Sequence, residues 1–189
     1  QRALVAIRRI NEVMDVEPEI RDRNTQPVTH FVRGEIEFRS LTFAYGDSAP
    51  VLNDVNLRIR AGTTVGIMGR VGSGKTTLAR LIPRLIQSGS NQLFIDGVPI
   101  EKWPLSQLRS TIGYVSQNPF LFSNTISANI SYGVHSASDA EIHQAAEWAQ
   151  LRKDVVEFDS GFETLIGERG VTLSGGQKQR STLARALLR

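Results

Sequence analysis

Cysteine is absent from the 189 residues, and long apolar runs are absent too. Without cysteine the chain forms no disulfides and no thiolate metal sites, which fits a reducing compartment such as the cytosol. No apolar stretch approaches the roughly 18 residues that a membrane-spanning helix needs. The first residues place arginines inside their apolar pattern, unlike a secretory signal. We therefore expect a globular piece that does not itself cross a membrane.

The chain also lacks a large excess of charge of either sign. Lysine and arginine number 22 against 19 acidic residues, a formal net charge of +3, and no basic run is dense enough to indicate a nucleic-acid partner. With 40% hydrophobic residues, the chain is long enough to bury a core of ordinary size. Composition thus predicts one globular domain, with or without an appendage, that binds no nucleic acid.

The first 32 residues differ in pattern from the rest. Between residues 1 and 16, apolar side chains recur at spacings of three and four, which predicts a helix with one apolar stripe. Residues 17–32 mix prolines and charges without a period and predict a linker over the surface. We expect the compact domain to extend from residue 33 to residue 189.

Period-two patterns in that domain predict antiparallel strands at residues 34–46 and 51–62. Further along the chain, Ser138 with Glu141 forms a capping box that predicts a helix start, and Pro83 should kink or end the helix in which it falls. The other predicted elements are strands at 63–69, 91–100 and 110–117 and helices at 75–86, 138–151 and 174–188.

A complete phosphate-binding pattern lies between the strand predicted at 63–69 and the next helix. It is GxxxxGK followed by threonine, formed by Gly69, Arg70, Val71, Gly72, Ser73, Gly74, Lys75 and Thr76. Glycines let backbone N–H groups converge on clustered negative charge, and the helix start adds its positive dipole end. Lys75 would reach the β- and γ-phosphates, the Thr76 hydroxyl would be a ligand of nucleotide-bound Mg²⁺, and Thr77 would contact the α-phosphate side.

Two other interpretations of the loop fit less well. A glycine-rich turn that merely opens a helix, with Lys75 solvated, does not explain the strand and helix context that the phosphate motif requires. A dinucleotide fingerprint would use Gly66, Gly69, Gly72 and Gly74, but Lys75 stands where that motif continues with a nonpolar residue, and no acidic residue is evident at the expected downstream strand end. The pattern favours a nucleoside triphosphate.

Further short stretches flank this loop in a fixed order. Tyr45 in FAYG precedes it and Gln117 in YVSQNPFLF follows it, then come GERG at residues 167–170 and LSGGQ, which is Leu173, Ser174, Gly175, Gly176 and Gln177. Together they resemble the nucleotide-binding domain of ATP-binding cassette (ABC) transporters over residues 33–189, and GERG with NPFLFSNTISANI is similar to the exporter branch. The resemblance implies an α/β P-loop NTPase fold with a RecA-like core, an antiparallel β subdomain and an α-helical signature subdomain.

The resemblance also implies roles for single residues. Tyr45 would stack on the adenine of ATP, although an aromatic packed in a strand has the same pattern. Gln117 would contact Mg²⁺ or the attacking water, where the membrane domain presses on the cassette; alone it would be a polar loop residue. Glu168 and Arg169 would signal between the site and the membrane domain, although such a pair is also typical of a charged surface.

The LSGGQ stretch, which we call the signature loop, would be a second anion site. Ser174 stands at a helix entrance and Gly175 and Gly176 expose backbone N–H groups, although a plain helix cap has the same pattern. In the family, two cassettes pack head to tail and each signature loop closes on the γ-phosphate held by the other. The resemblance therefore implies a second cassette, identical or different, as partner.

A membrane domain, in the same polypeptide, is the other partner that the resemblance implies, and the location is the cytoplasmic face of the cell membrane. The helix at 1–16 resembles the end of an exporter's last transmembrane helix, and a simple N-terminal helix docked on the domain has the same pattern. The leading hypothesis is the ATP-binding and energy-coupling domain of an exporter. The alternatives are a cassette ATPase that acts on DNA or ribosomes and a non-hydrolysing module.

The family's pattern ends early in these residues. The strand that carries an Asp and the catalytic Glu is not among them, and neither is the switch histidine, since His30, His135 and His143 all precede the signature loop. A general base must lie within hydrogen-bond reach of its water. We therefore expect residues 1–189 alone to hold no catalytic residue, to bind ATP poorly and to lack hydrolysis. We also expect the fold to be incomplete at the C-terminal side, with an apolar trench in the sheet where the missing strand would pair.

Overall fold

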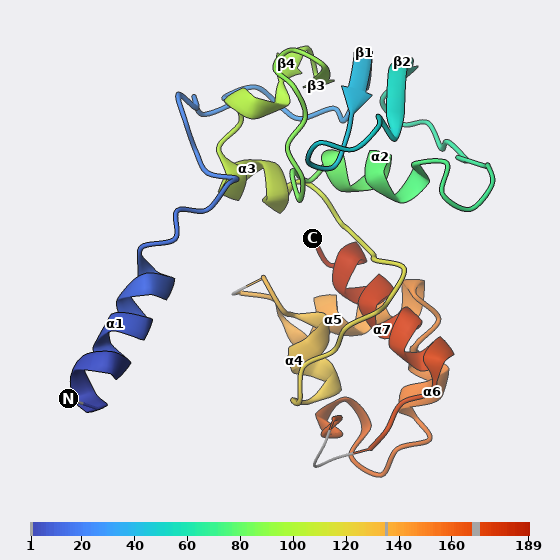
Figure 1. Ribbon diagram of the computed structural model, residues 1–189. Coiled ribbons are helices and arrows are strands. Elements are labelled where there is room, and N and C mark those ends of the chain that lie inside the picture. The colour runs from blue at the N-terminus through green and yellow to red at the C-terminus, as the bar shows by residue number, and fades with distance from the viewer. Residues whose placement is uncertain (1, 135, 168–170) are drawn as a thin grey trace. The chain divides into compact units, whose positions relative to one another are not determined.

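The computed structural model describes residues 2–134, 136–167 and 171–189 (Figure 1). Within the chain there are two compact units, residues 1–108 and residues 109–189. The first unit contains a β-sheet, and the second contains a cluster of short helices around its own apolar core.

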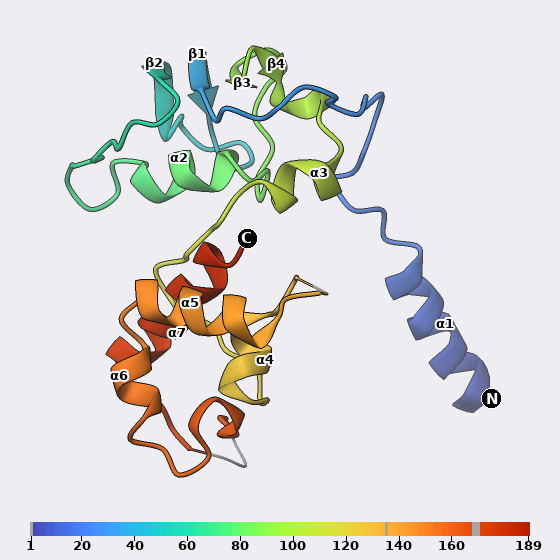
Figure 2. The same ribbon diagram turned by 180° about the vertical axis from the view of Figure 1, so that it is seen from behind.

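The first unit is built on a four-stranded antiparallel sheet in the order β2-β1-β3-β4. Phe38 in β1 pairs with Leu57 of β2 on one side and with Leu93 of β3 on the other. The prediction of antiparallel strands in this region is confirmed, and β1 and β2 lie side by side in both views (Figures 1 and 2). The strands are β1 (Ile36–Phe43), β2 (Leu52–Ile59), β3 (Leu93–Ile95) and β4 (Val98–Pro99).

A bulge in β1 changes which side chains face the core. Ser40 has a positive φ of 44°, and the register with β2 shifts between Phe38 and Leu41. An extra residue in one strand of a pair breaks the strict alternation of faces. Phe38 and Leu41, three positions apart, therefore both reach the core, with 2% and 0% of their surface exposed.

A tight turn at Asp96 and Gly97 joins β3 to β4 and also fixes the chain ahead of β1. Its φ angles of 50° and 78° suit a two-residue hairpin turn. The Asp96 carboxylate accepts hydrogen bonds from the N–H groups of Arg33 (2.7 Å), Gly34 (3.2 Å) and Glu35 (2.9 Å). Burial opposes ionisation, but these three N–H groups hold the pKa of Asp96 below its ordinary value.

The segment at residues 17–32, which we expect to be a linker, has no regular secondary structure. Side chains nevertheless attach it to the helix α3 (Leu105–Ser110), which follows a 3₁₀ turn, η1 (Ile100–Lys102). The Val28 backbone donates to Gln107 Oε1 (2.9 Å) and accepts from Gln107 Nε2 (2.6 Å). Asp22 accepts from the Leu105 N–H at the start of α3 (2.9 Å). The linker is thus hydrogen-bonded along the surface of its unit.

Helix α1 (Arg2–Met14) forms where the helix at 1–16 was predicted. Three of its apolar side chains are uncovered: Ile7, Ile10 and Val13 are exposed by 54%, 60% and 73%. Among the described residues, no helix combines the length and the apolar character that crossing a membrane requires.

Two predicted strands do not form. Residues 63–69 have no strand structure, and Val65 and Met68 there are exposed by 44% and 95%. The prediction at 110–117 was likewise wrong, since α3 ends at residue 110 and residues 111–117 have no strand structure. A parallel strand needs a hydrogen-bonded neighbour in the sheet and cover on both faces. The described sheet offers neither segment a neighbour, so an apolar run alone did not suffice.

The second unit is a cluster of helices. The longer ones, α5 and α7, pack with α4, and the three lie side by side in both views (Figures 1 and 2). The helices predicted at 138–151 and 174–188 are confirmed. The elements are α4 (Ile126–Ile130), α5 (Asp139–Trp148), α6 (Arg152–Val155), a 3₁₀ turn η2 (Gly161–Glu163) and α7 (Gly175–Leu187).

The start of α5 has the capping box that the sequence predicted. Glu141 Oε2 accepts from the Ser138 N–H at 2.8 Å, and the Ser138 hydroxyl in turn accepts from the Glu141 N–H at 3.4 Å. The hydrogen bonds from Ser138 hold the pKa of Glu141 below its ordinary value. The cap stabilises the start of α5, and Ala145 and Ala146 of this helix belong to the same buried cluster as Ala184 of α7.

Candidate functional site

The loop at residues 69–74 leads into α2 (Lys75–Leu81), which ends before Pro83 as predicted. Gly72 and Gly74 have φ angles of 83° and 85°, which only glycine adopts at little cost. They turn the loop around a cavity of about 220 Å³, which is lined by Val51 and residues 72–77. The predicted order of loop and helix is therefore confirmed, although the segment before the loop is not a strand.

Gly74 also permits a close approach. A Cβ built there would lie 2.7 Å from Leu52 Cδ2 and 3.1 Å from the Val51 carbonyl oxygen. Gly69 is similar, because its Cβ would lie 2.7 Å from Ser73 Oγ. The loop thus packs directly on the start of β2, and the sheet supports the cavity.

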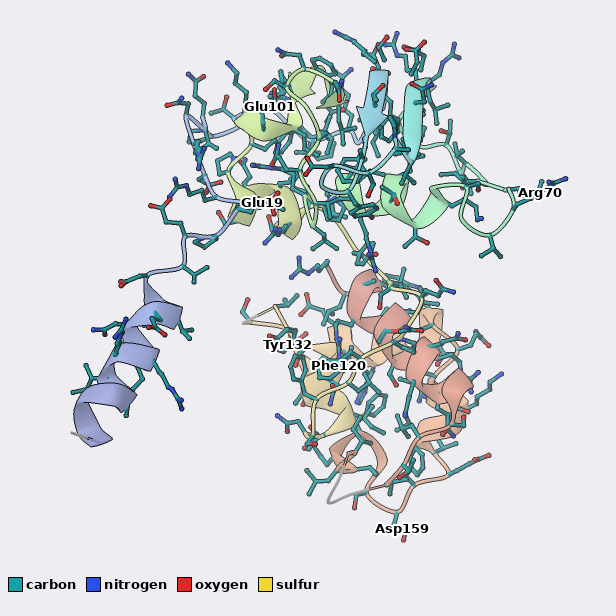
Figure 3. All side chains as sticks on the ribbon, in the orientation of Figure 1. Glu19, Arg70, Glu101, Phe120, Tyr132 and Asp159 are labelled. Carbon is teal, nitrogen blue, oxygen red and sulfur yellow. The ribbon has the colours of Figure 1, made fainter. Side chains whose placement is uncertain are left out.

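Lys75 folds back over the loop. Its Nζ donates to the carbonyl oxygens of Gly69 (2.9 Å) and Arg70 (2.7 Å), and Ser73 Oγ lies at 3.4 Å. Neutral oxygens hold an ammonium group less strongly than anionic ones do, so phosphate oxygens can replace them. By contrast, Arg70 points away from the loop (Figure 3) and Val71 is fully exposed.

The adjoining residues connect the loop to Tyr45. The Tyr45 hydroxyl and Thr77 Oγ1 share a hydrogen bond of 3.1 Å, and the Tyr45 ring meets Phe43 edge to face at 4.9 Å. Thr77 is buried and Thr76 is exposed in the cavity lining. The structure therefore brings Tyr45, Lys75 and Thr76 together around the start of α2.

The cavity has the chemistry of an anion site. Its lining includes the ammonium of Lys75 and the hydroxyls of Ser73, Thr76 and Thr77, and contains no carboxylate. The first N–H groups of α2 have no partners within the helix and add positive potential. A polyphosphate and a hard cation such as Mg²⁺, which prefers oxygen ligands, fit this set of donors and hydroxyls.

The signature loop forms the start of α7 in the second unit. Ser174 Oγ accepts from the Gln177 N–H (3.3 Å), and Gln177 Oε1 accepts from the Ser174 N–H (2.9 Å). Leu173 is 5% exposed and anchors the loop, whereas Gly175 and Gly176 are exposed. The predicted cap is confirmed, and the Gln177 side chain serves within it. The N–H groups of the two glycines face solvent at the positive end of the helix dipole.

The remaining candidate residues belong to the second unit and are distant from the phosphate loop in sequence. Gln117 is exposed, in a stretch without secondary structure. His143 stacks on Phe162 at 4.3 Å between ring centroids, a packing role within the second unit. Glu168 and Arg169, together with His135, lie outside the described residues.

Two side chains that the sequence analysis did not single out are Asn129 on α4 and Arg185 on α7. Arg185 donates to Asn129 Oδ1 (3.1 Å) and to its carbonyl oxygen (2.7 Å), and burial lowers the pKa of Arg185. The sequence held one signal, an arginine inside the period of an apolar helix, but it did not reveal the partner. Asp154 likewise holds Arg180 through two hydrogen bonds (2.6 and 2.8 Å).

The sequence model of one family, described as ABC transporter, matches residues 52–189. This chain belongs to the ABC transporter family. Curated relatives agree along its whole length: an uncharacterized ABC transporter ATP-binding protein, YwjA, and a probable multidrug resistance ABC transporter ATP-binding/permease protein, YheI, both from Bacillus subtilis, are each 43% identical over 100% of the chain. An ATP-dependent lipid A-core flippase of Syntrophus aciditrophicus is 41% identical, also over 100%.

Solved structures agree with this assignment. A bacterial Atm1-family ABC exporter with ATP bound matches 99% of this chain with a TM-score of 0.89 and 34% identity. The match confirms the P-loop NTPase fold of an ABC ATPase domain. This chain spans about a third of the length of its relatives. It covers 33%, 32% and 31% of the three curated proteins and 33% of the solved exporter.

Proposed function

We propose that this chain is the ATP-binding and energy-coupling domain of an exporter, in which ATP binding joins two cassettes and hydrolysis separates them. The observation that carries the proposal is the phosphate loop, where Lys75 and two left-handed glycines surround a cavity without acidic residues. Relatives named as a multidrug transporter and as lipid A-core flippases support the export direction.

ATP supplies the reactive phosphate, and Mg²⁺ with it neutralises phosphate charge. Lys75 would exchange the carbonyls of Gly69 and Arg70 for the β- and γ-phosphate oxygens. Thr76 would hold Mg²⁺ through its hydroxyl, and Gln117 would contact Mg²⁺ or the attacking water through its side-chain carbonyl oxygen. Backbone N–H groups at residues 72–77 would orient the phosphates, which is the main catalytic task in phosphoryl transfer.

Tyr45 would stack on the adenine. Its ring is 42% exposed and edge-on to Phe43, and its hydroxyl is tied to Thr77 beside the loop. A partly exposed, fixed ring next to the phosphate cavity has a free face for a base.

The signature loop would serve the ATP of a second cassette. Its first glycines expose N–H groups, and the capping box holds Ser174 in place. In a twofold pair each chain would contribute its phosphate loop to one shared site and its signature loop to the other. The pair of cassettes would lie at the cytoplasmic face of the membrane, and a membrane domain in the same polypeptide would follow its opening and closing. The uncovered apolar side of α1 fits a continuation from such a domain.

The test is Mg²⁺-dependent ATP hydrolysis by the complete polypeptide that contains this chain, reconstituted in lipid, with the Lys75→Ala variant as control. We expect hydrolysis that the variant loses, together with ATP-dependent movement of a lipid or drug probe. Hydrolysis without movement of any probe in vesicles would favour a cassette ATPase that acts on another machine. Nucleotide binding without hydrolysis would favour the non-hydrolysing module.

A further inference from the structure

The backbone between Gln117 and α4 is held by the buried side chain of Asn129. This side chain is 1% exposed, and each of its polar atoms is used. Its Oδ1 accepts from the Phe122 N–H (2.8 Å), and its Nδ2 donates to the carbonyl oxygens of Phe122 (3.0 Å) and Thr125 (2.9 Å). Both backbone groups of Phe122 are therefore fixed by one side chain on α4.

Arg185 joins the same backbone to α7. Its Nη1 donates to the Phe120 carbonyl oxygen (3.0 Å), while its Nε and Nη2 donate to Asn129 (2.7 and 3.1 Å). The guanidinium also lies over the rings of Phe122 and Tyr132, at 5.8 and 5.7 Å from their centroids. The Phe122 ring in turn lies 5.0 Å from the Phe120 ring and 4.3 Å from the Tyr132 ring, between ring centroids. We call these contacts the Asn129–Arg185 clamp.

Apolar side chains could fill the contact between α4 and α7 with equal or greater stability, because buried polar groups are expensive to desolvate. What the polar pair adds is direction. Hydrogen bonds fix the orientation of the carbonyls of Phe120 and Phe122, which dispersion contacts do not. All three acceptors of Arg185 are neutral oxygens, and two of them are backbone carbonyls. The clamp therefore orients the backbone and does not neutralise a negative charge.

We propose that Asn129 and Arg185 are positioning residues, which hold residues 120–125 to α7 so that the segment after Gln117 and the helix that begins at the signature loop move as one piece. The consequence for ATP hydrolysis rests on the proposed function, in which Gln117 and the signature loop both act on the nucleotide. The clamp itself rests on the contacts within the second unit.

Two variants weaken the clamp with little change in volume. Arg185→Lys keeps the charge and loses the fork that reaches Phe120 and Asn129 together. Asn129→Asp keeps the acceptor and loses both donors. The matched control is Arg180→Lys, the same change on the same helix, which loses the bidentate pair with Asp154 (2.6 and 2.8 Å) and leaves residues 120–125 untouched.

Hydrogen exchange in the complete polypeptide, followed by mass spectrometry of peptides over residues 120–125, tests the clamp. We expect Arg185→Lys and Asn129→Asp to accelerate exchange there by about tenfold, and Arg180→Lys to leave it unchanged. Unchanged exchange in both clamp variants would overturn the proposal. Equal acceleration by the Arg180→Lys control would also overturn it, because the effect would then be a general loosening of α7.

Steady-state kinetics tests the consequence. In Arg185→Lys we expect kcat to fall by about threefold or more with KM for ATP unchanged, since the phosphate loop belongs to the other unit. A raised KM with normal kcat would contradict positioning. If the wild-type polypeptide does not hydrolyse ATP, the proposed function fails, while the exchange comparison still decides whether the clamp holds the segment.

Discussion

Replacing Gly74 by alanine tests how the phosphate loop is held in its binding conformation. Gly74 has a φ of 85°, and an added Cβ would lie 2.7 Å from Leu52 Cδ2 and 3.1 Å from the Val51 carbonyl oxygen. The left-handed backbone costs about 1 kcal/mol for alanine, and the crowding adds roughly 1–3 kcal/mol. If the loop relaxes to relieve the sum of about 2–4 kcal/mol, ATP affinity falls by roughly 30- to 700-fold.

Gly72 supplies the matched control. Its φ of 83° is nearly the same, but no atom lies within 4 Å of its added Cβ. Gly72→Ala should therefore cost only the backbone contribution of about 1 kcal/mol, or roughly fivefold in affinity. The assay is fluorescence titration of the complete polypeptide with a trinitrophenyl ATP analogue. A loss of affinity as large in Gly72→Ala as in Gly74→Ala would refute the steric argument.

Substitutions at three further residues follow from the structure. Tyr45→Ala should weaken ATP binding by about 1–3 kcal/mol through lost stacking, and Tyr45→Phe should bind ATP within about threefold of wild type; equal losses in a binding titration would argue against stacking. Ser174→Ala removes a cap and should lower the unfolding free energy by about 1 kcal/mol in urea titration. Asp96 has a lowered folded pKa, so its stabilisation is present above the unfolded value of about 3.9 and is lost as the pH falls through the folded value. Asp96→Asn should therefore destabilise at pH 7 and approach wild type below about pH 4, and a gap in urea midpoints that widens on acidification would contradict this.

Local patterns predicted what depends on neighbours in sequence. The phosphate loop could be read because its glycines and Lys75 act within one turn of chain, and the box at Ser138 and Glu141 spans a single helical turn. The strands predicted at 63–69 and 110–117 failed for the opposite reason. A buried parallel strand is stabilised by partners distant in the chain, and apolar composition gives no information on whether those partners are there.

The clamp shows the same limit inside the second unit. Asn129 and Arg185 are separated by 56 positions, and neither stands in a motif that names the other. Their pairing depends on α4 packing against α7, which follows only from the tertiary fold. Lys75 offers a milder case, because the sequence predicted its location but not its contacts with the carbonyls of Gly69 and Arg70.

The exposed apolar residues have a bearing on solution behaviour. Val65, Ile67 and Met68 before the phosphate loop are exposed by 44%, 45% and 95%. An apolar segment whose backbone N–H and C=O groups lack a paired strand is prone to associate with other chains. Experiments on nucleotide binding therefore belong in the complete polypeptide, where further chain can cover this segment.

The central claim is that ATP is shared between the phosphate loop of one cassette and the signature loop of another. We would co-express a Lys75→Ala subunit with a Ser174→Arg subunit, purify mixed pairs through two tags, and measure Mg²⁺-dependent hydrolysis. One of the two shared sites is then intact, so we expect about half of wild-type activity. The control pairs a wild-type subunit with a subunit that carries both substitutions, which leaves no shared site intact and should be inactive. Activity in the control pair and none in the mixed pair would contradict the account.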